Sequence, residues 1–205
     1  MSDDRQTVHD DLAFMRQVVE AGNSRTAMAS GSAFFAAGLI YGAQCVLQWL
    51  GITGIMPLSP VGWLVVSLTP TVVLLAVLTW ILWGTSGMIE PRAQRFINAI
   101  FSAAGSTNLV ILIVIGTFAV RENNGLIWEL YACIVFALQG AGWLVAYTLR
   151  RRIWLLGVAL GWFASAILLG FLIGTETFVL VCALSLVFFM ALPGYVMMRL
   201  AKRAE

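Results

Sequence analysis

The most regular feature of the chain is a series of long apolar segments separated by short polar ones. They are residues 31–50, 61–84, 96–120, 126–149, 153–174 and 177–198. Each has about the 20 helical residues that cross a hydrocarbon core of roughly 30 Å. Inside lipid, every backbone N–H and C=O group needs a partner within its own segment, so runs of this length form helices. The sequence therefore predicts an all-α membrane protein, with a six-transmembrane-helix bundle over residues 30–199.

Glycine, proline and asparagine mark the breaks between these segments and some points within them. Residues 51–60 and residues 123–125 have the composition of turns. Pro91 suits the first turn of the third helix. Pro70 and Pro193 lie inside the second and sixth segments. We expect both to kink their helices and to free backbone carbonyl groups.

A separate helical pattern precedes the first apolar segment. Its apolar positions repeat at helical spacing, at Val8, Leu12, Met15 and Val19. Thr7 is a suitable N-cap and Gly22 a suitable stop, which predicts a short cytoplasmic amphipathic helix within residues 1–29. Residues 200–205 form a cytoplasmic tail.

The polar face of this helix is acidic, whereas helices that lie on membranes usually carry lysine and arginine. We therefore expect it to dock on basic cytoplasmic loops, such as Arg150, Arg151 and Arg152, or on a partner protein. The simpler alternative is a solvated helix that rests its apolar stripe on its own bundle.

Composition places the chain in the lipid bilayer and argues against nucleic acid as a partner. Hydrophobic residues make up 60% of the sequence and charged residues only 11%. The net charge is +2, and the basic residues do not gather on one face.

Basic residues in the loops predict the orientation, because lysine and arginine resist transfer across the membrane during insertion. All but Arg121 fall on one side: Arg5, Arg16, Arg25, Arg92, Arg95, Arg150, Arg151, Arg152, Arg199, Lys202 and Arg203. Both termini are therefore predicted to be cytoplasmic. The excess of arginine over lysine is typical of a GC-rich bacterial genome, which indicates a bacterial inner (plasma) membrane.

Each predicted helix has a polar residue near its middle: Gln44, Thr71, Asn108, Gln139, Ser165 and Ser185. Gln48 shares a helix face with Gln44, and Trp162 lies near the bilayer centre. If these side chains converge, they form a site for a small neutral or zwitterionic solute. The predicted substrate-binding residues are Gln44, Gln48, Thr71, Asn108, Gln139 and Trp162. The alternative is that the polar groups hold the helices together through hydrogen bonds.

Glu129 is the one acidic residue within a predicted span, near the outer end of the fourth helix. Charged residues inside membranes are candidates for function, so Glu129 is a candidate for proton coupling. At this depth it can also reach water or pair with Arg121.

Three glycine pairs have the GxxxG spacing that lets helices approach closely: Gly38 and Gly42, Gly157 and Gly161, and Gly170 and Gly174. They favour helix contacts within one molecule. Self-association or capture of a partner protein through these glycine-rich faces is the alternative.

The predicted spans lack the groups that most membrane enzymes and metal sites use. The single histidine, His9, precedes the first span, and no lysine or aspartate lies inside one. Cys45, Cys133 and Cys182 have no histidine beside them. We expect no metal, no cofactor and no enzymatic activity. The predicted function is transport or binding of a small solute, and the alternative is a non-catalytic accessory or sensory membrane subunit that binds a partner protein.

Overall fold

The computed structural model describes residues 2–85 and 92–203, and it places side chains within 24–81, 83–84 and 95–203. Every regular element over these ranges is a helix. The elements are α1 (Ser2–Ile52), α2 (Pro60–Thr85), α3 (Arg92–Glu122), α4 (Leu126–Arg150), α5 (Ile153–Leu172), α6 (Thr177–Leu186), the π-helical turn η1 (Val187–Ala191) and α7 (Leu192–Lys202). Six helical stretches are long and apolar enough to cross a membrane. This confirms the all-α class and the six apolar helices.

Except for the start of α1, the helix ends lie within a few residues of the predicted ones, because the breaks have strong local signals. Asn123 takes a left-handed conformation with φ 46°, and the Asn124 side chain accepts a hydrogen bond of 3.0 Å from the backbone N–H of Leu126. Gly174 has φ 82° in the turn between α5 and α6, a conformation that favours glycine. The start of the third helix at Pro91 lies outside the described residues.

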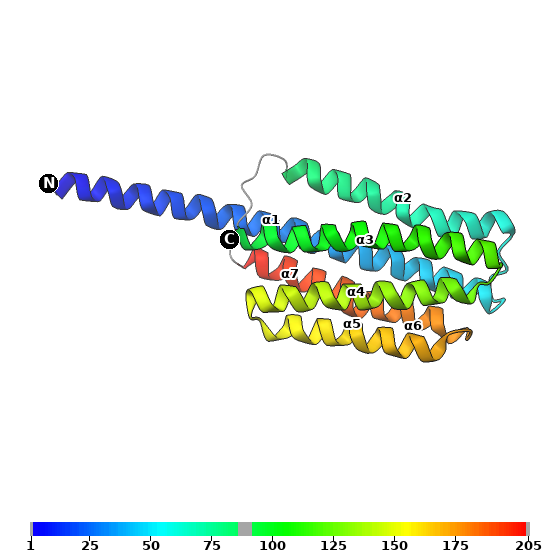
Figure 1. Ribbon diagram of the computed structural model, residues 1–205. Coiled ribbons are helices and arrows are strands. Elements are labelled where there is room, and N and C mark those ends of the chain that lie inside the picture. The colour runs from blue at the N-terminus through cyan, green and yellow to red at the C-terminus, as the bar shows by residue number, and fades with distance from the viewer. Residues whose placement is uncertain (1, 86–91, 204–205) are drawn as a thin grey trace.

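The predicted stop at Gly22 was wrong. One helix, α1, runs without interruption from Ser2 to Ile52, and its N-terminal half projects beyond the bundle (Figure 1). An internal glycine reduces the stability of a helix by only about 1 kcal/mol relative to alanine. This loss is too small to end a helix by itself, so the helix continues through Gly22. The projecting half does not fold back toward the junction of α4 and α5 (Figure 1), which contains Arg150, Arg151 and Arg152. The side chains of the amphipathic stripe, from Val8 to Val19, lie outside those described.

Close backbone approaches join α1 to the C-terminal helix. A Cβ atom added to Gly38 would overlap the backbone of Ala191, and one added to Gly194 would overlap the backbone of Phe35. A Cβ atom added to Gly42 would lie 3.2 Å from the side chain of Val187, which is a tight contact but involves no backbone overlap. The Gly38 and Gly42 pair therefore makes a contact within the molecule, as expected.

The other two glycine pairs do not form comparable seams. Gly161 lies against the ring of Phe189, and Gly174 belongs to a turn. Gly157 and Gly170 face open space, which in a membrane is occupied by lipid.

The buried core lies among α4, α5, α6 and η1. Trp143, Trp162 and Leu169 are its largest fully buried side chains. The helices α2 and α3 are peripheral: α2 packs on α1, and α3 packs on α4. In the most apolar stretch of each peripheral helix, no residue is buried within the protein. These two helices therefore contribute little to the core.

The sixth apolar segment contains a π-helical turn instead of a simple proline kink. The backbone N–H of Leu192 bonds to the carbonyl of Val187, five residues earlier, and Pro193 follows directly. Pro193 has no N–H to give to Phe189, four residues before it. The predicted loss of a helical hydrogen bond at Pro193 is thus confirmed, and the chain absorbs it by widening one turn.

Candidate functional site

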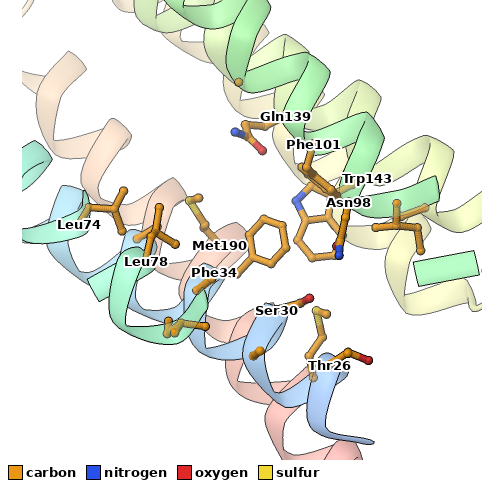
Figure 2. Close-up of a pocket in the computed structure, with 18 of the residues that line it drawn as sticks. Thr26, Ser30, Phe34, Leu74, Leu78, Asn98, Phe101, Gln139, Trp143 and Met190 are labelled. Atoms are coloured by element: carbon orange, nitrogen blue, oxygen red, sulfur yellow. The ribbon is translucent and has the colours of Figure 1, made fainter. Parts of the chain in front are cut away.

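A cavity of about 670 Å³ lies mainly between α1, α2, α3 and α4, and Leu155 of α5, Met190 of η1 and Met197 of α7 complete its lining. This volume is in the range of small-molecule sites. Figure 2 shows the side chains that line it. On α1 they run from Thr26 to Tyr41, and on α4 from Gln139 to Arg150. The cavity therefore extends from the middle of the bundle toward the end that carries the arginines.

The middle of the cavity is aromatic and aliphatic. The rings of Phe34, Phe101 and Trp143 contact one another, with centroids 4.9–5.7 Å apart. Leu74 and Leu78 of α2 lie across from Phe34 (Figure 2). These walls suit the apolar body of a ligand.

Two buried polar atoms on the cavity lining have no hydrogen-bond partner, namely Oε1 of Gln139 and Nε1 of Trp143. Trp143 is only 2% exposed. Residues four apart on a helix lie on the same face, so α4 presents an acceptor and a donor side by side. An unpaired buried polar group costs about 1–3 kcal/mol, and a ligand that pairs with both atoms recovers this energy.

The structure brings together two of the predicted binding residues and links a third to them. Asn108 and Gln139 both line the cavity. The Tyr131 hydroxyl donates a hydrogen bond of 3.0 Å to the side-chain oxygen of Asn108, which fixes the orientation of that amide. Thr71 does not line the cavity, but its hydroxyl lies 3.4 Å from the hydroxyl of Tyr41, which does.

Gln44, Gln48 and Trp162 lie elsewhere. On α1 the lining ends at Tyr41, so both glutamines lie beyond the cavity toward the far end of the bundle. Trp162 is 1% exposed in the core, where its Nε1–H donates a hydrogen bond of 2.9 Å to the carbonyl oxygen of Phe189.

The predicted layer of polar side chains is divided into two groups. Ser165 of α5 and Ser185 of α6 are buried and hydrogen-bonded to each other at 3.0 Å. They hold the two helices together and do not reach the cavity, whereas the amides of α3 and α4 face it.

The Glu129 carboxylate accepts a hydrogen bond of 2.6 Å from the backbone N–H of Gly174, in the turn between α5 and α6. The expected partner, Arg121, instead lies 3.8 Å from the carboxylate of Glu122. Glu129 precedes Gln139 by ten residues on α4, or about 15 Å, so it is remote from the cavity. Its contact ties the start of α4 to the end of α5.

Several lining residues were not among the predicted binding residues, above all Trp143 and Arg150. The helical spacing contained a signal: Gln139, Trp143, Ala146 and Arg150 are four, three and four residues apart, which places them on one face of α4. Phe34 and Phe101 had no such signal, because apolar residues surround the apolar helices on every side.

No three His, Cys, Asp or Glu side chains lie close enough to hold a metal ion among the residues that the structure describes. Cys45, Cys133 and Cys182 are free thiols. Cys182 is buried in the core, and the other two pack against the same cluster.

No family model, no curated protein and no solved structure matches this chain.

Proposed function

We propose that the protein binds a small solute in the cavity between α1 and α4 and moves it across the membrane. The observation that carries this proposal is the pair of unpartnered polar atoms, Oε1 of Gln139 and Nε1 of Trp143, on two residues of a largely apolar lining. Helix assembly alone gives no reason to bury both atoms unpaired. No catalytic role is part of the proposal.

The moving part in this proposal is the half of α2 that follows Pro70. The α2 residues on the lining, Leu74, Leu78 and Ile81, all follow this proline. A proline within a helix removes one backbone hydrogen bond and weakens the helix at that point. Thr71, beside the proline, contacts Tyr41 of α1. Movement about Pro70 would open the cavity without disturbing the core.

We further propose that the protein resides in a bacterial inner membrane with both termini in the cytoplasm. Arg25, Arg150 and Arg199 lie at the end of the bundle toward which the cavity extends. Arginine-rich loops remain in the cytoplasm, so the cavity would occupy the cytoplasmic half of the bilayer.

Blocking the cavity tests the proposed function. Gly105 lines the cavity, and a Cβ added there meets no atom within 4 Å, so Gly105→Phe fills the cavity without a backbone clash. Gly157 has equally open surroundings on α5 and does not line the cavity, so Gly157→Phe is a matched control. Native mass spectrometry after mild detergent extraction measures the retained small molecules.

We expect a small molecule that the wild type and Gly157→Phe retain and Gly105→Phe loses. Equal retention by both variants, or no retained molecule in the wild type, would contradict the proposal.

The alternative function, an accessory or sensory subunit, is favoured by the half of α1 that projects beyond the bundle (Figure 1). A helical segment that projects beyond its own bundle offers a surface to another protein. Removing residues 2–20 tests this alternative: a co-purifying protein lost upon truncation supports it, whereas loss of the small molecule with no loss of protein argues against it.

A further inference from the structure

The side chains that α4 contributes to the cavity change from uncharged polar groups to a cation along the helix, and this sequence of groups indicates a class of ligand. This inference rests on the proposed function. Four α4 residues face the cavity in sequence: Gln139, Trp143, Ala146 and Arg150. The first two present an unpaired acceptor and an unpaired donor, and the last presents a cation. Gln139 and Arg150 are eleven residues apart, or about 16 Å along the helix.

Charge distinguishes the two ends of this cavity. Arg150 is the only charged residue on the lining, which contains no aspartate, glutamate or histidine over the part of the chain that the structure describes. Asn98 and Thr26 add polar groups to the lining. A cation in partly apolar surroundings favours a ligand with one negative charge, because the interaction is stronger at low dielectric constant.

The inner end of the cavity, at the middle of the bundle, favours an uncharged polar group on the ligand. Oε1 of Gln139 is an unpaired acceptor and Nε1 of Trp143 is an unpaired donor, and the two residues lie on one face of α4 (Figure 2). An amide supplies both complements within one planar group, since its N–H donates to Gln139 and its C=O accepts from Trp143. Between the two ends, the buried side chain of Ala146 leaves room for an apolar body.

We infer that the ligand is a small amphipathic organic anion, with its negative charge at Arg150 and an amide-type group, distant from the charge, at Gln139 and Trp143. The predicted neutral or zwitterionic solute is thereby replaced by an anionic one.

Three matched probes test this inference in phosphatidylcholine nanodiscs. The first is the monoamide of dodecanedioic acid, which has a carboxylate at one end and an amide at the other. Its methyl ester keeps the amide and loses the charge, and dodecanoic acid keeps the charge and loses the amide. Native mass spectrometry gives the bound fraction of each probe, and Gly105→Phe measures the background from the lipid.

We expect the monoamide to bind about tenfold more tightly than either control, as one charge-assisted or two neutral hydrogen bonds imply. Arg150→Gln should make the monoamide and its ester equal, whereas Arg151→Gln, at an exposed residue outside the lining, should leave their difference unchanged. Trp143→Phe and Gln139→Leu should each reduce the preference for the monoamide over dodecanoic acid by about threefold to tenfold.

Equal binding of the monoamide and its ester by the wild type would overturn the inference and leave the proposed function standing. If none of the probes binds but Gly105→Phe still displaces an endogenous molecule, this inference is likewise overturned and the proposed function stands. If none of the probes binds and Gly105→Phe also displaces no endogenous molecule, both this inference and the proposed function are overturned. In nanodiscs that contain phosphatidylglycerol, unchanged binding supports a small-molecule anion, and lost binding would identify a lipid headgroup as the occupant and overturn the inference.

Discussion

The indole Nε1–H of Trp162 lies 2.9 Å from the carbonyl oxygen of Phe189 and donates a hydrogen bond to it. Phe189 is four residues before Pro193, which has no N–H, so this carbonyl has no α-helical donor. The indole on α5 replaces the hydrogen bond that the proline removes. The π-helical turn and the buried tryptophan therefore both compensate for the N–H that Pro193 lacks.

Removing the indole donor should destabilise the protein. Trp162→Phe keeps an aromatic ring and leaves the Phe189 carbonyl without its donor, at a cost of about 1–3 kcal/mol in the free energy of unfolding. Trp80→Phe is the control, because Trp80 is 76% exposed. Thermal unfolding in detergent provides the measurement.

Pro193→Ala restores the missing N–H and gives this pair a double-mutant test. In the Pro193→Ala background, Trp162→Phe should cost less than in the wild type, by a coupling energy within about 0.5–3 kcal/mol. Additive effects of the two substitutions would show that the indole does not compensate for the proline.

A single methyl group at Gly38 should disrupt the packing of α1. Gly38→Ala places a Cβ atom against the backbone of Ala191, which cannot move as a side chain can, so we expect a loss of about 1–3 kcal/mol or more. Gly157→Ala faces open space and should gain up to about 1 kcal/mol from helix propensity. Similar unfolding temperatures for the two variants would refute the close approach.

Glu129 should act on stability through Gly174. Glu129→Ala removes the acceptor of the 2.6 Å hydrogen bond, and we expect a loss of about 1–3 kcal/mol. Glu122→Ala, which removes only an exposed contact with Arg121, should change stability by less than about 1 kcal/mol. Chemical denaturation of the purified variants measures both.

The proton-coupling prediction for Glu129 has a separate readout. If the Glu129 carboxylate carries a coupled proton, Glu129→Gln removes the dependence of solute uptake on a proton gradient. We expect the other outcome, in which Glu129→Gln leaves the response of uptake to a proton gradient unchanged, because Glu129 lies about 15 Å along α4 from Gln139. Loss of that dependence, with uptake along a solute gradient unchanged, would assign the coupling role to Glu129.

Restoring the backbone N–H at position 70 of α2 should slow transport more than it weakens binding. Pro70→Ala restores a backbone N–H within the helix and stiffens the segment that carries Leu74 and Leu78. We expect an uptake rate several-fold lower with unchanged binding of the retained small molecule. Pro57→Ala, in the loop before α2, is the control. An unchanged rate in Pro70→Ala would exclude movement about this proline.

Reporter fusions test the proposed orientation. Green fluorescent protein fused after Glu205 should fluoresce, because it folds in the cytoplasm, whereas alkaline phosphatase at that position should be inactive. The pattern should reverse for fusions at Asn123, in the turn between α3 and α4. An active phosphatase after Glu205 would place the cavity in the outer half of the bilayer.

The sequence alone determined the number of long apolar helices and, except for the start of α1, their ends to within a few residues. This was possible because the bilayer demands that each span satisfy its own backbone hydrogen bonds, so the signal is local to each segment. The turn at Asn123 and the missing hydrogen bond before Pro193 were local in the same way. Gly22 shows the limit, because its local signal for a helix end was too weak to stop α1.

Only the tertiary structure decided which side chains meet. Glu129 and Gly174 are 45 residues apart in the chain, and Trp162 and Phe189 are 27 apart. A helix that is apolar on every side gives no indication of which face turns inward, because lipid and core accept the same side chains. The rotation of α3 and α4 placed Asn108 and Gln139 at the cavity, whereas Gln44 and Gln48 lie beyond the end of its lining on α1.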